Sequence, residues 1–267
     1  MHDPRFERTR LLLGEAALAR LAAARVTVVG LGAVGSYAVE GLARGGVGHL
    51  RLVDFDRVEI SNINRQLYAL ESTLGRPKAE LAAARVKDIN PACAVEALAL
   101  FVNRETVAAV LEPRPDLVID AIDSLNAKVT LLAACVEAGV PAIASMGAAR
   151  RTDPAQIRVA DIGETFGCPL ARFVRKRLHR RGIRSGIRCV FSGEAADDAT
   201  VECGVRSAEC GEGEPEPRTL NPEPSLAPPG GRPRRAMGSS SCLTGIMGLM
   251  AAQEAIRLLT ATRDDTA

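Results

Sequence analysis

The first 150 residues alternate between short apolar runs and segments of helical periodicity. Each run is rich in Val, Ile, Leu and Ala, and a length of roughly four to eight residues is typical of a buried strand. The predicted strands cover residues 26–29, 49–54, 94–101, 117–121 and 141–145, and the predicted helices cover 33–44, 77–89, 105–111 and 125–138. This alternation predicts the α/β class, with a doubly wound, mostly parallel, Rossmann-like sheet.

A different pattern begins after residue 150. A strand at 155–162, a basic helix at 170–181 and a strand at 188–192 predict a smaller C-terminal layer. Pro, Gly, Glu and Arg dominate the next stretch, which predicts a mobile crossover or a partly disordered linker. The apolar segment after it predicts a buried closing helix, with peripheral membrane contact as the alternative. We expect an N-terminal helical arm (1–24), a nucleotide-binding domain (25–150), a basic layer (151–194), the linker or crossover (195–238) and the closing helix (239–267).

The composition is typical of a globular protein with an aliphatic core. Of the 267 residues 47% are hydrophobic, but only 3% are aromatic and none is Trp. The first ten residues contain no apolar run, so we expect neither a secretory signal nor a membrane anchor, and a cytoplasmic location. The seven cysteines include no C-x-x-C pair, which argues against a disulfide framework and against a structural zinc site.

A glycine-rich turn follows the first predicted strand. Gly30, Gly32 and Gly35 permit a tight turn, so that the N–H groups at the start of the next helix can face phosphate oxygens. Asp54 ends the following strand, where an acid commonly binds a ribose hydroxyl. The pattern predicts a bound nucleotide and leaves its identity open between NAD, FAD and others.

Two cations and an acid bear on which nucleotide is bound. Arg65 lies in a polar segment, and Lys78 follows a Gly-Arg-Pro turn. Such cations favour phosphoryl or nucleotidyl transfer, because hydride transfer develops no charge on a triphosphate. Asp123 follows the fourth predicted strand, where its carboxylate can hold Mg²⁺. The alternatives are solvated loop charges for the cations, a helix N-cap for Asp123 or Asp120, and a turn residue for Asn62.

In order and spacing, motifs within residues 5–147 resemble the E1-like adenylating superfamily, which includes the ThiF and MoeB sulfur-carrier activators. They are Gly30-x-Gly32-x-x-Gly35, Asp54-x-Asp56, Ser61-Asn62-x-Asn64-Arg65-Gln66, the Gly-x-x-Lys that ends at Lys78, Ile89-Asn90-Pro91 and Asp123. The resemblance implies ATP and Mg²⁺ as cofactors. It also implies that a carboxylate attacks the α-phosphate to give an acyl-adenylate and pyrophosphate.

The same resemblance implies roles for individual residues. Asp54 would hold the ribose, while Arg65 and Lys78 would bind the phosphates. Asn62 would help to position them, and Asp123 would bind the metal. The full set implied for the nucleotide site is Gly30, Gly32, Ala33, Gly35, Asp54, Asp56, Asn62, Arg65, Gln66, Lys78 and Asp123.

The second half of the chain resembles the tRNA threonylcarbamoyladenosine dehydratase subfamily. The resemblance rests on Val118–Ser124, Asp153-Pro154 with Gln156-Ile157, Pro169-Leu170, and Cys189-Val190-Phe191-Ser192-x-Glu194. Members of that subfamily activate the carboxylate of the threonylcarbamoyl group on adenosine 37 of tRNA (t6A37). The activated carbonyl then closes into a ring with net loss of water, so the resemblance implies tRNA as the substrate.

The basic segment 172–188 is a separate reason to expect RNA. It holds eight Arg or Lys residues and no acid, although the net charge of the whole chain is only +2. The expected phosphate contacts are Arg172, Arg175, Lys176, Arg177, Arg180, Arg181, Arg184 and Arg188. The alternative is a solvated basic helix.

Partners and rival functions remain open from the sequence. Arg8 lies in a segment that resembles the arginine finger of the superfamily, which implies a role in the partner's site across a homodimer. A sulfur-transfer protein is a further candidate partner. The main rival function is adenylation of the C-terminus of a ubiquitin-like sulfur-carrier protein, followed by an NAD-dependent oxidoreductase and a non-catalytic nucleotide sensor. Cys168 and Cys189 are interpreted as buried structural residues, not as covalent catalysts.

Overall fold

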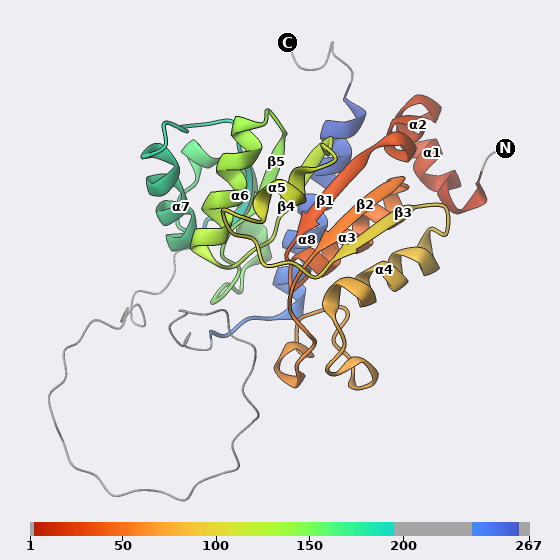
Figure 1. Ribbon diagram of the computed structural model, residues 1–267, viewed down its shortest axis with the longest axis horizontal. Coiled ribbons are helices and arrows are strands. Elements are labelled where there is room, and N and C mark those ends of the chain that lie inside the picture. The colour runs from red at the N-terminus through yellow and green to blue at the C-terminus, as the bar shows by residue number, and fades with distance from the viewer. Residues whose placement is uncertain (1–2, 195–236, 262–267) are drawn as a thin grey trace, which may run out of the picture.

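The computed structural model describes residues 3–194 and 237–261. Within these residues seven strands form one sheet in the order β3-β2-β1-β4-β5-β7-β6 (Figure 1). Neighbouring strands run parallel, except that β6 pairs antiparallel with β7 at one edge. The strands are β1 (Arg25–Val29), β2 (His49–Val53), β3 (Ala94–Leu98), β4 (Leu117–Asp120), β5 (Ala142–Ser145), β6 (Ile157–Asp161) and β7 (Arg188–Ser192).

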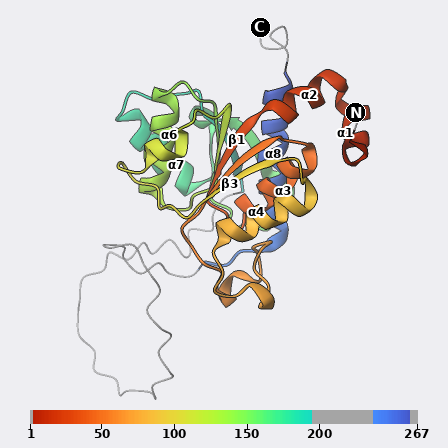
Figure 2. The same cartoon turned by 45° about the vertical axis from the view of Figure 1, so that its right-hand side comes forward.

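Helices cover both faces of this sheet. The described α-helices are α1 (Glu7–Leu13), α2 (Glu15–Ala23), α3 (Gly35–Gly45), α4 (Lys78–Ile89), α5 (Val107–Leu111), α6 (Leu125–Glu137), α7 (Pro169–His179) and α8 (Ser241–Thr260). Short 3-10 turns lie at Pro4–Phe6, Ile60–Asn62, Glu71–Thr73, Pro154–Gln156 and Ile162–Glu164. Figures 1 and 2 show α3, α4 and α8 on one face and α5, α6 and α7 on the other.

Each face of the sheet buries its own aliphatic cluster. Val28, Leu42 and Met247 belong to the cluster under α3 and α8, whereas Val118 and Leu132 belong to the cluster under α6 and α7. Burial on both faces explains why the strands are continuous apolar runs rather than alternating ones. The doubly wound, mostly parallel α/β prediction is confirmed.

Helix α8 closes the core, as expected for the C-terminal segment. It packs so closely on α3 that a Cβ at Gly248 would collide with the carbonyl oxygen of Val34. By length and composition α8 is the one described helix that could cross a membrane. Its buried residues, which include Met247, Ala251 and Ala255, are instead part of the α3 side of the core.

Two expectations about the chain's organisation change. Segment 151–194 does not build a layer of its own strands, because β7 pairs with β5 and β6 pairs with β7 in the main sheet. The pattern changes there because β6 reverses direction at the sheet edge. The helical arm is also broken, since α1 ends at Leu13 and α2 begins after Gly14. Residues 195–236, most of the predicted linker, lie outside the described residues.

The predicted bounds of the elements are close to those observed, with differences at the loop ends. The strand predicted to reach residue 101 ends at Leu98, and the helix predicted from residue 105 begins at Val107. Asn103 accepts hydrogen bonds from the N–H groups of Glu105 and Thr106, so a side-chain turn occupies the difference. These shifts do not move any candidate site residue.

Candidate active site

Strands β1 and β4 lie side by side in the sheet, and the helices that follow them cover opposite faces. Helix α3 follows β1 and packs with α8, whereas α6 follows β4 and packs with α7. In open α/β sheets the crevice at the carboxyl ends of such a strand pair is the usual ligand site. The loops after β1, β2, β4 and β5 all leave from this edge. Parallel pairing therefore brings together the glycine turn, Asp54, Asp56 and Asp123.

The glycine turn passes directly over the end of β4. Gly30 has φ of +88°, and a Cβ there would lie 2.8 Å from the carbonyl oxygen of Ala121. Both the left-handed backbone and the close approach exclude a side chain at this position. Gly32 has Gln66 as its neighbour, with the amide nitrogen 3.6 Å from where a Cβ would be. The first turn of α3 is thus left open towards the crevice, as a phosphate site requires.

Asp54 connects the end of β2 to the glycine turn. Its carboxylate accepts hydrogen bonds from the N–H of Leu31 at 2.6 Å and from the N–H of Asp56 at 2.8 Å. The side chain is buried, and this burial raises the pKa of Asp54 above its ordinary value. Asp54 therefore fixes the shape of the loop that a nucleotide would contact, a role that its predicted contact with ribose does not exclude.

Lys78 is a buried cation at the first residue of α4. Only 5% of the residue is exposed, and its Nζ lies 2.9 Å from Oδ2 of Asp56, whose own side chain is about half exposed. A buried ammonium with one partly solvated carboxylate partner keeps two donors for a further anion. The structure thus places Lys78 next to the Asp54–Asp56 loop, where the sequence predicted a phosphate contact.

Arg65 and Asn62 are held within their own loop. Arg65 donates from Nη1 to the carbonyl oxygen of Ser61 at 2.7 Å and to Oδ1 of Asn64 at 2.8 Å. Asn62 is buried, and its Oδ1 accepts from the N–H of Glu59 at 3.3 Å. These bonds fit the turn role that was the alternative for Asn62.

Two acids lie at the end of β4, and they differ in exposure. Asp123 is exposed in the loop that precedes α6. Asp120 is fully buried, and its Oδ2 lies 2.7 Å from Nζ of Lys128. Lys128 also donates to the carbonyl oxygen of Ser145 at 2.9 Å, which joins β4, β5 and α6 beneath the crevice. The sequence interpretation missed Lys128, although a lone cation in the apolar run of α6 was a visible signal.

Arg8 is far from the crevice of its own chain. It lies in α1, which Figure 1 shows at the end of the sheet where the strands begin. Gly46, at the C-terminus of α3, is the neighbour of Phe6 at this end. The glycine turn lies at the opposite end of β1, so Arg8 does not join the site of its own chain.

The basic helix α7 divides its cations between solvent and protein. The exposed set is Arg172, Lys176, Arg177, Arg180, Arg181 and Arg184. Arg177 in this set contacts Asn126 of α6. Arg175 turns inward instead, and its Nη1 donates to the carbonyl oxygen and to Oγ1 of Thr165, both at 2.7 Å. Nη1 of Arg175 therefore holds the turn before α7 and is not available for the predicted RNA contact.

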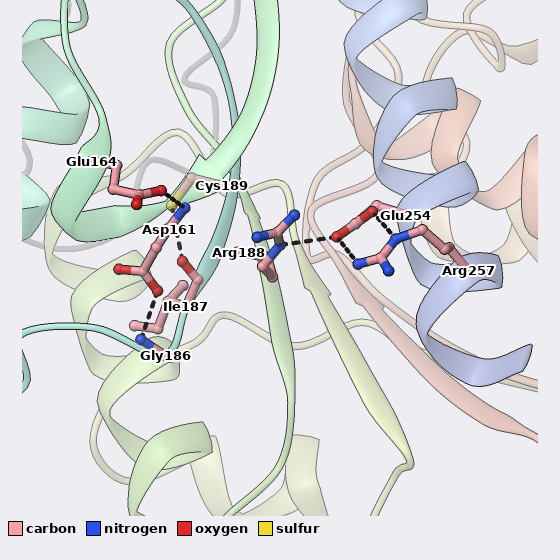
Figure 3. Close-up of polar contacts among 8 residues, drawn as sticks. All are labelled: Asp161, Glu164, Gly186, Ile187, Arg188, Cys189, Glu254 and Arg257. Atoms are coloured by element: carbon pink, nitrogen blue, oxygen red, sulfur yellow. Dashed lines mark hydrogen bonds and ion pairs between the residues drawn. The ribbon is translucent and has the colours of Figure 1, made fainter. Parts of the chain in front are cut away.

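Arg188 was also predicted as an RNA contact, but the structure places it on the other face of the sheet from α7. The residue lies on β7, whose side chains alternate between the two faces, and it points to the α8 face, away from α7. Its Nε lies 2.9 Å from Oε1 of Glu254, which also binds Arg257, and Figure 3 shows these three side chains together. Arg188 therefore joins the sheet to α8 and does not extend the basic surface of α7.

The cysteines near the crevice are structural. Cys168 and Cys189 are both buried, and Sγ of Cys168 accepts from the N–H of Ala171 at 3.5 Å, which caps α7. Burial raises the pKa of the Cys189 thiol, so a thiolate nucleophile is disfavoured. Among residues 3–194 and 237–261 no group of three or more His, Cys, Asp or Glu side chains is arranged to hold a metal ion. Cys203 and Cys210 lie outside the described residues.

The doubly wound sheet, with the glycine turn and the buried cation Lys78 at its carboxyl edge, is that of a nucleotide-binding α/β protein. The chain belongs to the ThiF family, whose sequence model matches residues 6–267. The resemblance stated from the motifs is thereby confirmed.

Similar proteins narrow the family further. The chain is 42% identical over 226 residues to the tRNA threonylcarbamoyladenosine dehydratase of Bacillus subtilis (strain 168), which covers 83% of this chain and 89% of that protein. The crystal structure of E. coli tRNA N6-threonylcarbamoyladenosine dehydratase, TcdA, in complex with ATP matches with a TM-score of 0.79 and 34% identity, covering 98% of this chain and 96% of that one. The molybdopterin-synthase adenylyltransferase of Escherichia coli (strain K12) is 39% identical over 129 residues, which is 48% of this chain and 51% of that protein.

Proposed function

We propose that this chain catalyses the ATP-dependent dehydration of t6A37 in tRNA through an acyl-adenylate. The observation that carries the proposal is the extent of the likeness to the dehydratases, which runs through the nucleotide-binding half and on through β6, α7 and β7. The molybdopterin-synthase adenylyltransferases of Escherichia coli and Salmonella typhimurium match 48% and 65% of this chain, against 83% for the dehydratase of Bacillus subtilis. The second half of this chain is therefore the part that favours a tRNA substrate over a carrier protein.

ATP fits the crevice between β1 and β4. Gly30 leaves the turn free of side chains, and the start of α3 offers N–H groups to phosphate oxygens. Lys78 supplies a buried positive charge beside the turn, and Arg65 would add a second one from the loop that precedes α4. With Asp54 at the ribose end, the chain has groups for the phosphates and for the ribose of the nucleotide. Hydride transfer would leave these cations without a chemical role.

Mg²⁺ would be held by Asp123 together with phosphate oxygens. The carboxylate is exposed at the carboxyl edge, and oxygen ligands suit this ion. When bound, the ion would neutralise charge that develops on the phosphates. Asp120 is unsuitable as a ligand, because Lys128 already occupies its Oδ2.

The chemistry asks little of the chain beyond binding and positioning. The carboxylate oxygen of the threonylcarbamoyl group attacks the α-phosphorus, and the bond to pyrophosphate breaks. A nitrogen of the same side chain then attacks the activated carbonyl carbon, and AMP leaves as the ring closes. Over the two steps the nucleoside loses the elements of water. The ring closure is intramolecular and therefore has a high effective molarity, so no covalent cysteine is needed.

The exposed face of α7 is proposed to bind tRNA phosphates. Arg172, Lys176 and Arg180 recur every four residues and share one helix face. Helix α7 begins next to Gly147, at the same edge of the sheet as the ATP site. We further propose a homodimer in which Arg8 enters the partner's site, and a cytoplasmic location. A sulfur-transfer protein remains a candidate partner.

Mass analysis of tRNA nucleosides tests the function directly. The full chain is incubated with t6A37-bearing tRNA, ATP and Mg²⁺. The tRNA is then digested to nucleosides, and their masses are measured by mass spectrometry. Loss of one water from t6A, absent when ATP is omitted, is expected. If ATP–pyrophosphate exchange instead appears only with a sulfur-carrier protein, the function is wrong and the rival is right.

A further inference from the structure

Arg151 is a buried cation whose hydrogen bonds are incomplete. Only 4% of the residue is exposed. Its Nη2 donates to the carbonyl oxygen of Gly167 at 2.9 Å. Neither Nε nor Nη1 has a partner within the part of the chain that the structure describes. An unpaired buried donor costs about 1–3 kcal/mol, and more when the group is charged, so this arrangement requires an explanation.

Glu194 does not supply the missing hydrogen bonds of Arg151. Both carboxylate oxygens of Glu194 accept hydrogen bonds from the two residues that follow Arg151. The donors are the N–H of Thr152 at 3.0 Å, Oγ1 of Thr152 at 3.1 Å and the N–H of Asp153 at 3.1 Å. These backbone bonds lower the pKa of Glu194, and the charge of Arg151 lowers it further. Glu194 thus fixes the loop that carries Arg151 and is not a hydrogen-bond partner of Nε or Nη1.

The position of Arg151 indicates what it faces. It lies in the loop after β5, at the carboxyl edge of the sheet and two strands away from β1. Strands are spaced by roughly 4.8 Å, so the end of β5 is about 10 Å from the end of β1. Gly167, which accepts the bond from Arg151, immediately precedes the residue that caps α7. Arg151 is therefore at the same edge of the sheet as the proposed ATP crevice, beside the turn that precedes α7.

We infer that Arg151 binds an oxyanion of the tRNA substrate, either the carboxylate that is activated or a backbone phosphate beside it. The inference rests on the proposed function. The phosphates of ATP are served by Lys78 and Arg65 from the β1–β2 side, so an acyl substrate has to approach from the β4–β5 side. A guanidinium is the side chain best suited to carboxylate or phosphate, and low local polarity strengthens the pair. Because Nε and Nη1 are buried, contact with a ligand requires a shift of the loop 146–153, which contains no helix or strand.

The test compares two forms of one tRNA, with and without the threonylcarbamoyl group. Dissociation constants for both are measured with the wild-type chain, with Arg151→Gln and Arg151→Lys, and with Arg150→Gln as the matched neighbour. Arg151→Gln is expected to weaken binding about 10- to 100-fold, and Arg151→Lys less. Weakening for the t6A form alone identifies the carboxylate as the ligand, and equal weakening for both forms identifies a backbone phosphate. Arg150→Gln should bind both forms like the wild type.

Other outcomes overturn the inference. Unchanged dissociation constants in a folded Arg151→Gln chain would do so, and so would weaker ATP binding with unchanged tRNA binding. If the Arg151 variants do not fold, hydrogen exchange on the wild type decides, since tRNA should protect the peptide 146–153 and unchanged exchange rejects the site. The function is judged separately, because a wild-type chain that leaves t6A intact refutes the proposed reaction whatever Arg151 does.

Discussion

Lys128 and Asp120 form a fully buried ion pair beneath the crevice, with Nζ and Oδ2 2.7 Å apart and neither side chain exposed. Burial raises the pKa of Asp120, and the ammonium of Lys128 opposes that rise. The other carboxylate oxygen accepts from the N–H of Ile122 at 3.0 Å. The pair therefore fixes the start of the loop that carries Asp123.

Breaking this pair from one side should destabilise the fold. Lys128→Met leaves Asp120 buried without its cation, and the expected loss in the free energy of unfolding is about 3–5 kcal/mol. Asp120→Asn with Lys128→Met removes both charges and keeps the bond to Ile122, so it should recover part of the loss. Urea unfolding of the three chains measures the difference. A single variant as stable as the wild type would contradict the account.

Lys78 should be required for adenylation. Lys78→Ala removes the buried cation, and we expect t6A-dependent AMP release to fall by about 100-fold or more. Lys87→Ala, at the other end of α4, removes a lysine that only contacts the carbonyl oxygens of Pro91 and Cys93, and should keep normal turnover. Equal activity in the two variants would reject the phosphate role of Lys78.

The outward cations of α7 should set the salt dependence of tRNA binding. Replacing Arg172, Lys176 and Arg180 together by Gln should reduce the slope of log K against log salt by about 2 to 3. Arg188→Gln removes a cation of the same segment that faces α8, and should leave the slope unchanged. Binding titrations at several salt concentrations distinguish the two. If the triple variant keeps the wild-type slope, α7 does not bind the tRNA.

Glu254 should make stability depend on pH at the acid end. Its hydrogen bonds with Arg257 and Arg188 lower the pKa of Glu254 below its ordinary value of 4.5 (Figure 3). A lowered folded-state pKa gives stability that is present above 4.5 and is lost as the pH falls through the folded value. Glu254→Gln should therefore have a lower melting temperature than the wild type at pH 7. This difference in melting temperature should shrink as the pH falls through the folded-state pKa. A difference that stays constant across that range would refute this.

Arg8 is expected to act in the partner's site of the proposed homodimer. Arg8→Ala and Arg65→Ala chains should each be inactive alone, because each lacks one of the two proposed charges at every site. Mixed dimers have one site with both residues intact, so mixing the variants should restore part of the activity. Turnover that stays absent in a verified mixed dimer would reject the action of Arg8 in the partner's site.

The nucleotide crevice was predictable from sequence because its parts are local. Each part is recognisable from the residues next to it in sequence. The parts are a glycine at positive φ (Gly30), an acid at the end of the next strand (Asp54) and a lysine at the start of a helix (Lys78). Parallel pairing then sends all these loops to one edge of the sheet. The pattern thus indicated both the fold and the edge where the site lies.

The direction in which each charged side chain points was not predictable from sequence, because side chains on one segment can face different neighbours. The run 172–188 is uniformly basic in sequence, yet Arg175 bonds Thr165 and Arg188 bonds Glu254. Glu254 is 66 residues away from Arg188 along the chain, so no local pattern links them.

The sequence alone determined the α/β alternation, the glycine turn and the order of the candidate site residues, since these follow from local periodicity and backbone conformation. The tertiary structure decided that β6 and β7 extend the main sheet and that Lys128 neutralises Asp120. It also decided that Arg151 is buried and that its Nε and Nη1 have no partner among the described residues. These facts depend on contacts between segments distant in sequence. The physical reason is that burial and ion pairing are properties of the packed chain and are not encoded in any one stretch of it.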